Sequence, residues 1–162
     1  VKKMQTIDVL INNAGIARLQ MFQDITEDDW NEMIDTNLKS AFYMSQEVVP
    51  NMIHKKSGCI INISSIWGLV GASCETVYSI SKAGMDALTK SLAKELGPSN
   101  IRVNSIAPGV IDTEMNSHID KTIKKETPFR WCAIVKFRIW HSRVIGYAIF
   151  LYAVFFCLNS SS

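Results

Sequence analysis

The chain has 162 residues, a length typical of one domain. Apolar residues make up 48% and charged residues 20%, a composition typical of a globular protein and not of a disordered segment. The formal net charge of +2 gives no support for a nucleic-acid partner, which would call for a strongly basic surface.

The charges divide the chain in two. Residues 1–127 hold 13 of the 17 Lys and Arg and all 15 Asp and Glu, whereas residues 128–162 hold four basic residues, no acid and five of the seven Phe. We therefore place a boundary at residue 127 and interpret 128–162 as an aberrant tail, the product expected from an AT-rich gene read in the wrong frame. The alternative is a membrane anchor over Val144–Leu158, but that run is shorter than the roughly 20 apolar residues that a span needs.

The four cysteines (Cys59, Cys74, Cys132 and Cys157) form no C-x-x-C pair, and no histidine lies at zinc-site spacing. We expect free thiols in a reducing cytoplasm and no metal. The chain starts at Val1 without a signal peptide or an initiator Met, so we expect the sequence to be a fragment.

The first predicted elements are a strand and a long helix. Residues 7–11 form a β-branched run that stops at Asn12-Asn13-Ala14-Gly15, which predicts a buried strand followed by a turn. Thr26, with Asp29 three residues later, is a helix-capping pattern. Apolar residues at helical spacing then predict a helix over about 30–56, bent near Pro50 and ended by Gly58.

The next elements repeat this alternation. Residues 59–63 predict a second buried strand, followed by Ser64-Ser65 and a loop marked by two glycines. A helix is expected over 76–96 and a third strand over 101–107. Strands alternating with helices predict an α/β fold with a parallel sheet between two helical layers.

Three polar clusters follow the three strands: Asn12–Gly15, Ser64-Ser65, and Pro108 to Thr113. In doubly wound sheets ligands bind outside the carboxyl ends of the strands, so the clusters predict one shared site.

Tyr78 and Lys82 are four residues apart and therefore share a helix face. An ammonium beside a phenol lowers the phenol pKa from about 10, which makes tyrosine usable as a general acid or base. Ser65 precedes that helix and can polarise a substrate carbonyl through a hydrogen bond.

Five motifs together resemble the short-chain dehydrogenase/reductase family over residues 7 to about 127. They are N-N-A-G (12–15), D-T-N-L-K-S around Asn37, I-S-S ending at Ser65, Y-S-I-S-K (78–82) and I-A-P-G-V-I-D-T (106–113). The resemblance implies a partial doubly wound, Rossmann-type parallel sheet in three layers that lacks its first three strands. It also implies NADP as cofactor, with NAD as the alternative.

The resemblance assigns roles to single residues. It makes Tyr78 the proton donor, Lys82 the group that lowers the Tyr78 pKa and holds the nicotinamide ribose, and Ser65 the group that orients the substrate oxygen. Asn37 would hold a water that relays protons to Lys82. The implied cofactor-binding residues are Asn12, Ala14, Gly15, Tyr78, Lys82, Pro108, Gly109 and Thr113.

Within the family the sequence is most similar to the 3-oxoacyl-acyl-carrier-protein reductases of fatty acid biosynthesis. Residues 66–75 instead resemble a subgroup that reduces an aminopentanone group on elongation factor P. Trp67, Cys74 and Glu75 are expected to border the substrate pocket, where Glu75 either pairs with a substrate amine or is a solvated loop carboxylate.

The chain lacks the T-G-x-x-x-G-x-G phosphate loop with which family members begin. We therefore expect the fragment to bind NADPH weakly or not at all, and a catalytically dead remnant is the second hypothesis. An intact protein would reduce a small-molecule or carrier-bound ketone as a homotetramer assembled through helices 30–56 and 76–96.

Overall fold

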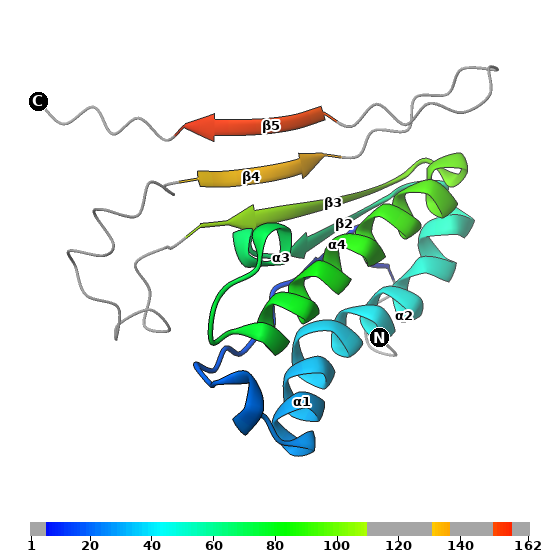
Figure 1. The fold of residues 1–162 in the computed structure, drawn as a ribbon. Coiled ribbons are helices and arrows are strands. Elements are labelled where there is room, and N and C mark those ends of the chain that lie inside the picture. Colours follow the sequence, from blue (N-terminus) through cyan, green and yellow to red (C-terminus); the bar gives the residue numbers. More distant parts are fainter. Residues whose placement is uncertain (1–5, 110–130, 137–150, 157–162) are drawn as a thin grey trace, which may run out of the picture.

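The computed structural model describes residues 6–109, 131–136 and 151–156. They form a five-stranded sheet (Figure 1) in the order β1-β2-β3-β4-β5. The strands are β1 (Val9–Asn12), β2 (Gly58–Ile63), β3 (Ile101–Pro108), β4 (Trp131–Lys136) and β5 (Leu151–Phe156). The first three strands are parallel, and β4 and β5 each pair antiparallel with their neighbour. The predicted α/β fold with a parallel sheet is confirmed by these first three strands.

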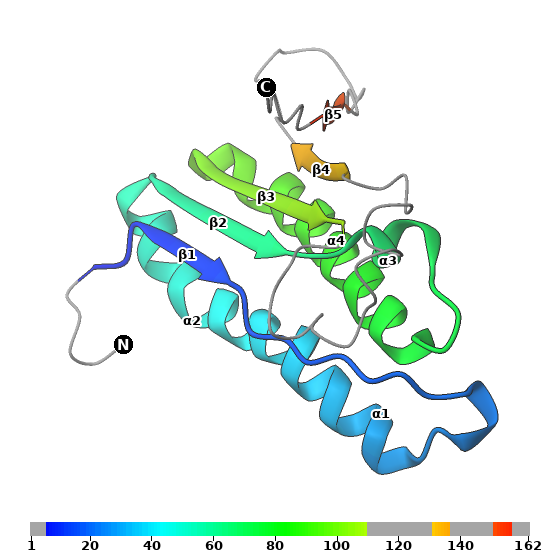
Figure 2. The same cartoon turned by 90° about the vertical axis from the view of Figure 1, so that its left-hand side faces the viewer.

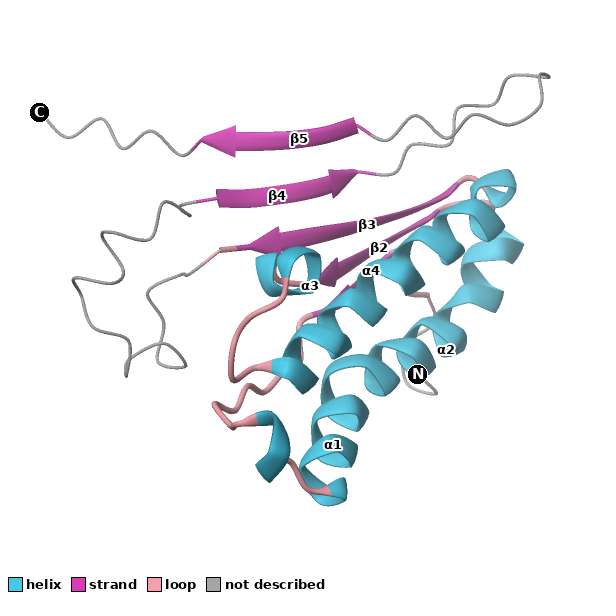
Figure 3. Ribbon diagram, in the orientation of Figure 1, coloured by secondary structure: helices cyan, strands magenta, loops and turns pink. Residues whose placement is uncertain are grey.

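Helices connect the parallel strands (Figure 3). They are α1 (Glu27–Ile34), α2 (Ser40–Lys55), α3 (Ile66–Val70) and α4 (Thr76–Leu96), with short 3-10 turns at Phe22–Asp24 and Gly97–Ser99. The sequence predicted α4 at its observed bounds but assigned the α3 segment to a loop. Five residues are too few to show helical periodicity, which is why α3 was missed.

Figures 1 and 2 show α2 and α4 on the same side of the sheet. The described residues thus contain two of the three expected layers. The reason is topological, because right-handed crossovers that add strands in one direction place every helix on one face. A second helical layer requires a reversal of strand order, and β1-β2-β3 contains none.

The helix after Thr26 begins as its capping pattern predicts. The Thr26 hydroxyl accepts a hydrogen bond from the Asp29 N–H at 3.1 Å, and the Asp29 carboxylate accepts one from the Thr26 N–H at 3.1 Å. The regular helix is interrupted by a π-helical turn at Asp35–Lys39, not near Pro50, which lies inside α2. This turn inserts one extra residue into the helical repeat.

A buried polar chain crosses the interface between the sheet and the helices. Asn12 of β1 donates to the Asn62 side chain at 2.8 Å and to Ser45 of α2 at 3.3 Å. Asn62 of β2 donates in turn to Thr89 of α4 at 2.8 Å. Because Asn12 and Asn62 are register partners, one network fixes both strands to both helices. An apolar cluster that includes Ile60 and Val103 packs between the same strands and helices.

The edge strand β1 exposes 54% of Val9 and 58% of Ile11. Exposed apolar side chains on an edge strand are a feature that favours aggregation. In the described part of the chain, no helix is both long and apolar enough to span a lipid bilayer. Of the apolar run at Val144–Leu158, only the residues of β5 are described, so its interpretation stays a prediction.

Replacing Asn62 with alanine is expected to lower the free energy of unfolding by about 2–3 kcal/mol, because it leaves the buried Asn12 and Thr89 groups without their partner. Urea denaturation measures the loss. Asn51→Ala, at an exposed position on α2, is the control and should change the midpoint little. An equal loss in both variants would contradict a stabilising network.

Candidate active site

The carboxyl ends of β1, β2 and β3 meet at one edge of the sheet, because the three strands are parallel. The Ser64 N–H donates to the Ile106 oxygen at 2.7 Å, which holds the ends of β2 and β3 together. Pro108 and Gly109 are half-buried at the end of β3. The three predicted polar clusters therefore begin at one edge, although Thr113 lies outside the described residues.

Lys82 of α4 points its ammonium group at this edge. The side chain is only 4% exposed, and Nζ donates to the Ile63 oxygen at 2.8 Å. The same Nζ lies 5.7 Å from the centre of the Tyr78 ring. Burial lowers the pKa of Lys82, and the charge of Asp86 opposes that shift.

Gly15 lies against this ammonium group. A Cβ atom at Gly15 would lie 3.3 Å from Lys82 Nζ and 3.5 Å from Asn37 Oδ1. A side chain here would therefore crowd both groups. Gly15 and Lys82 come from positions 67 residues apart and form one wall of the site.

Asn37 is fully buried in the π-helical turn. Its Oδ1 accepts from the Ile16 N–H at 2.7 Å, and its Nδ2 donates to the Ile16 oxygen at 2.9 Å and to Ser81 Oγ at 3.0 Å. The side chain thus joins the loop after β1 to α4. These three bonds occupy both amide hydrogens, so the proton relay expected of Asn37 cannot use its side-chain NH₂ as a further donor.

Ser65 caps α3 and faces Tyr78. Its hydroxyl accepts from the Trp67 N–H at 3.2 Å and lies close enough to the Tyr78 phenol to oppose the rise in the pKa of that phenol. Gly68 sets the distance between α3 and α4, because a Cβ there would lie 2.8 Å from the Lys82 carbonyl carbon. The sequence predicted only a loop at Gly68. Its role in helix packing could not be predicted, because it depends on a contact between two helices.

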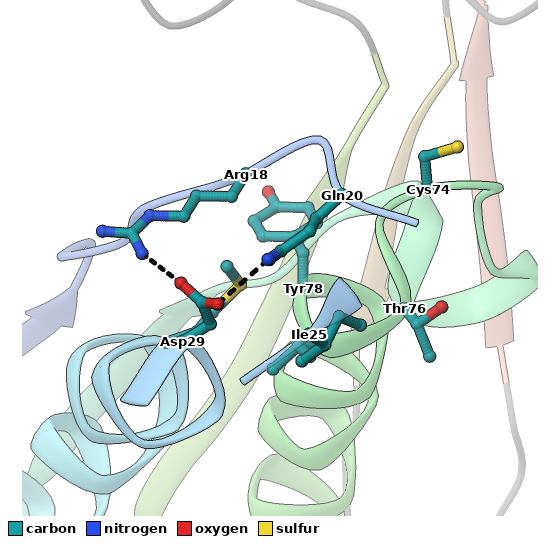
Figure 4. Close-up of a pocket in the computed structure, with 9 residues that line it drawn as sticks. Arg18, Gln20, Ile25, Asp29, Cys74, Thr76 and Tyr78 are labelled. Atoms are coloured by element: carbon teal, nitrogen blue, oxygen red, sulfur yellow. Dashed lines mark hydrogen bonds and ion pairs between the residues drawn. The ribbon is translucent and has the colours of Figure 1, made fainter. Parts of the chain in front are cut away.

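A pocket opens beside Tyr78 (Figure 4). It is lined by Arg18, Gln20, Ile25, Asp29, Met33, Cys74, Thr76, Val77 and Tyr78. Two loops close around it, since the Gln20 N–H donates to the Cys74 oxygen at 2.8 Å. Asp29 pairs with Arg18 at 2.6 Å, and its bonds to Thr26, Gln20 and Arg18 hold its pKa well below the usual range.

The model of the short chain dehydrogenase family matches residues 1–124. The chain belongs to the short-chain dehydrogenase family. It is 47% identical over 124 residues to the 3-oxoacyl-acyl-carrier-protein reductase of Chlamydia pneumoniae, covering 76% of this chain and 50% of that protein. Against the reductase of the same name from Thermotoga maritima, the identity is 45% over 125 residues, 77% of this chain and 51% of that protein.

Two further relatives extend this comparison. An uncharacterized oxidoreductase of Bacillus subtilis is 40% identical over 123 residues, 76% of this chain and 51% of that protein. The solved structure of a 4-hydroxyisoleucine dehydrogenase complexed with NADH superposes with a TM-score of 0.65 at 43% identity, covering 67% of this chain and 48% of that one. The chain thus spans about half the length of the curated relatives that it matches.

The pKa of Tyr78 departs from its prediction. The sequence led us to expect that Lys82 lowers it, whereas in the structure burial raises the pKa of the Tyr78 phenol, the Ser65 hydrogen bond opposes the rise, and the charge of Glu75 adds to it. The expected lowering by Lys82 is therefore wrong for this structure. The physical reason is that the burial of the phenol outweighs the other contributions, while Lys82 Nζ is engaged with the Ile63 oxygen.

Some of the other residues predicted for the site lie near Tyr78 in the structure, and others do not line this pocket. Cys74 lines the pocket, and Glu75 is close enough to Tyr78 for its charge to act on the phenol. Trp67 lies on α3 and is not among the residues that line this pocket. Ala14 is exposed beside Gly15, whereas the Asn12 side chain points into the buried network.

Sequence reasoning missed the wall that faces Tyr78, which includes Arg18, Gln20 and Thr76. Asp29 was noted only as a helix cap. No local pattern marks these residues, because the pocket arises where the loop after β1 packs on the loop before α4.

We expect the Tyr78 phenol to ionise above its ordinary value of about 10. The folded state then binds the phenolic proton more tightly than the unfolded chain, so this group favours folding less as the pH rises through 10. Subtracting the tyrosinate absorbance titration of Tyr78→Phe from that of the parent isolates this phenol. Glu75→Gln removes the anion and should move its titration to lower pH, and an upward shift would contradict this assignment.

Proposed function

We propose that this chain carries the catalytic centre of a nicotinamide-dependent reductase that converts a ketone to a secondary alcohol. The observation that carries the proposal is the convergence of Ser65, Tyr78 and Lys82 at one edge of the sheet. The nicotinamide cofactor supplies a hydride when bound. A substrate carbonyl oxygen between Ser65 and Tyr78 would accept hydrogen bonds from both hydroxyls.

Tyr78 suits the role of proton donor in this direction of reaction. A general acid has to be protonated before it can act, and a phenol whose pKa burial raises above the ordinary value of about 10 is protonated at neutral pH. Ser65 supplies a second donor where negative charge develops on the carbonyl oxygen. The Lys82 ammonium adds a nearby positive charge that favours the same oxyanion.

The residues at the carboxyl edge fit the nicotinamide half of such a cofactor. Gly15 leaves backbone, without a side chain, against Lys82 Nζ and Asn37 Oδ1. Lys82, together with the ends of β1 and β3 at Ala14, Pro108 and Gly109, would hold the ribose and the ring. We propose NADP as the cofactor, with NAD as the alternative.

For the substrate we propose a 3-oxoacyl group on an acyl carrier, as the names of the relatives suggest. A ketone that carries an amine, such as the aminopentanone group on elongation factor P, is the second candidate. It is favoured by the position of Glu75, whose charge acts on Tyr78. Glu75→Gln distinguishes the two, because it should weaken reduction of a cationic ketone selectively and leave that of an acyl ketone nearly unchanged.

We further propose that the intact protein is a cytoplasmic homotetramer. Support comes from exposed apolar side chains on α2 and α4, among them Phe42, Met44 and Ile80. The free thiols of Cys59 and Cys74 fit a reducing compartment.

The central test is Tyr78→Phe in the full-length protein that contains this chain. Loss of the phenolic proton donor is expected to lower kcat by at least about 100-fold, the usual contribution of general acid catalysis. The measurement is NADPH oxidation with a 3-oxoacyl thioester. Tyr43→Phe, which removes a hydroxyl from an exposed position on α2, is the matched control and should retain the rate.

Two outcomes would contradict the proposal. If Tyr78→Phe retained more than a few per cent of the rate, another group would be the proton donor. If the parent protein showed neither NADPH binding nor turnover, the chain would be a non-catalytic remnant.

A further inference from the structure

Asp86 is a buried carboxylate that the proposed chemistry does not use. It lies on α4 one turn after Lys82, and its exposed fraction is 3%. Ser105 of β3 donates to its Oδ1 at 2.6 Å. Its Oδ2 is buried and has no hydrogen-bond partner within the described residues.

A purely structural role explains this residue poorly. Burying a carboxylate is costly unless a positive charge and hydrogen bonds compensate it. One hydroxyl donor to Oδ1 could be satisfied equally well by the amide oxygen of an asparagine, without any charge to bury. A buried acid with one oxygen unsatisfied therefore calls for a positive partner nearby.

Lys82 is a buried positive charge that an anion nearby would stabilise. Its ammonium is buried, and its one hydrogen bond within the described residues goes to a neutral carbonyl, that of Ile63. The charged group that favours its protonated form is Asp86. Burial raises the pKa of Asp86, and the hydrogen bond from Ser105 and the charges of Lys90 and Lys82 oppose that rise.

Three consecutive residues at the end of β2 connect this pair to the site. The Ile63 oxygen accepts from Lys82 Nζ at 2.8 Å. Ser64 donates to the Lys82 carbonyl at 3.1 Å and lies close enough to Asp86 to oppose the rise in the pKa of that carboxyl. Ser65 acts in the same way on the pKa of the Tyr78 phenol. The side chains at 78, 82 and 86 thus meet the same strand end on successive turns of α4.

We propose that Asp86 is the buried counter-charge of Lys82, a positioning residue that keeps the ammonium protonated and held at the Ile63 oxygen beside Tyr78. This inference rests on the proposed function for its catalytic meaning. The pairing itself does not, because it concerns two groups inside the folded chain.

The groups that face this pair come from three elements. Helix α4 contributes Tyr78 and Lys90 as titratable neighbours, and Glu75 at its start acts on Tyr78. Strand β3 contributes the Ser105 hydroxyl, and the end of β2 contributes the Ser64 hydroxyl. Within the described residues, Asp86 is the anion that acts on Lys82. Its removal should therefore lower the pKa of Lys82.

The test is Asp86→Asn in the full chain, read from the ¹⁵N titration of Lys82 Nζ, which Lys82→Arg assigns. Loss of the anion is expected to lower the pKa of Lys82 by about one pH unit or more, the size typical of a nearby opposite charge. Asp86→Glu restores the charge and should recover most of the shift. Glu95→Gln removes an exposed acid from the same helix and is the matched control.

An unchanged Lys82 titration in a folded Asp86→Asn variant would overturn the inference. If that variant fails to fold, Ser105→Ala replaces it. Loss of the Ser105 bond should raise the pKa of Asp86, seen by ¹³C carboxyl NMR, and lower the apparent pKa of Lys82 over the pH range in which Asp86 is then protonated. A shift of Asp86 with none at Lys82 would again overturn it.

Activity separates this inference from the proposed function. In an active protein, Asp86→Asn should shift the high-pH limb of kcat to lower pH, whereas Glu95→Gln should not. If the parent protein is inactive and Asp86→Asn still shifts the Lys82 titration, the result contradicts the proposed function and supports the pairing of Asp86 with Lys82.

Discussion

The arrangement of the site depends on one interaction, the hydrogen bond from Lys82 Nζ to the Ile63 oxygen. It joins the middle of α4 to the last residue of β2, so the ammonium has a fixed place at the carboxyl edge of the sheet. Tyr78, one turn earlier, then lies where Ser65 can reach it. A lysine held in this way stabilises charge at a defined point, which a solvated lysine on a flexible stem does not do.

The surrounding fold explains why this bond is available. The buried chain from Ser45 through Asn12 and Asn62 to Thr89 fixes α4 against the sheet, and Gly68 lets α3 approach the backbone at Lys82. The Asn37 side chain connects the loop after β1 to α4, because it hydrogen-bonds with the Ile16 backbone and with Ser81. These contacts are either polar or need a glycine, which has no side chain. They therefore specify one geometry more strictly than apolar packing does.

Local patterns predicted the parallel strands and α4 closely, because β-branched runs, helical spacing and the Thr26 cap all act over a few residues. The sequence also singled out Ser65, Tyr78 and Lys82, since they follow a strand end or share one helix face, and the structure brings them to one edge of the sheet, while their catalytic roles stay predictions. The pocket wall at Arg18 and Gln20 was missed, as was the Asn62 network, because both arise from contacts between distant segments. Only a folded chain shows such contacts.

The sign of the Tyr78 shift bears on the role that we propose for this residue. A phenol with a lowered pKa would be equally ready to give or take a proton near neutral pH, and would serve oxidation and reduction alike. Burial instead favours the protonated form, and the charge of Glu75 adds to it. A protonated phenol is the state that can give a proton to a carbonyl oxygen, which is the role that the proposed function assigns to Tyr78.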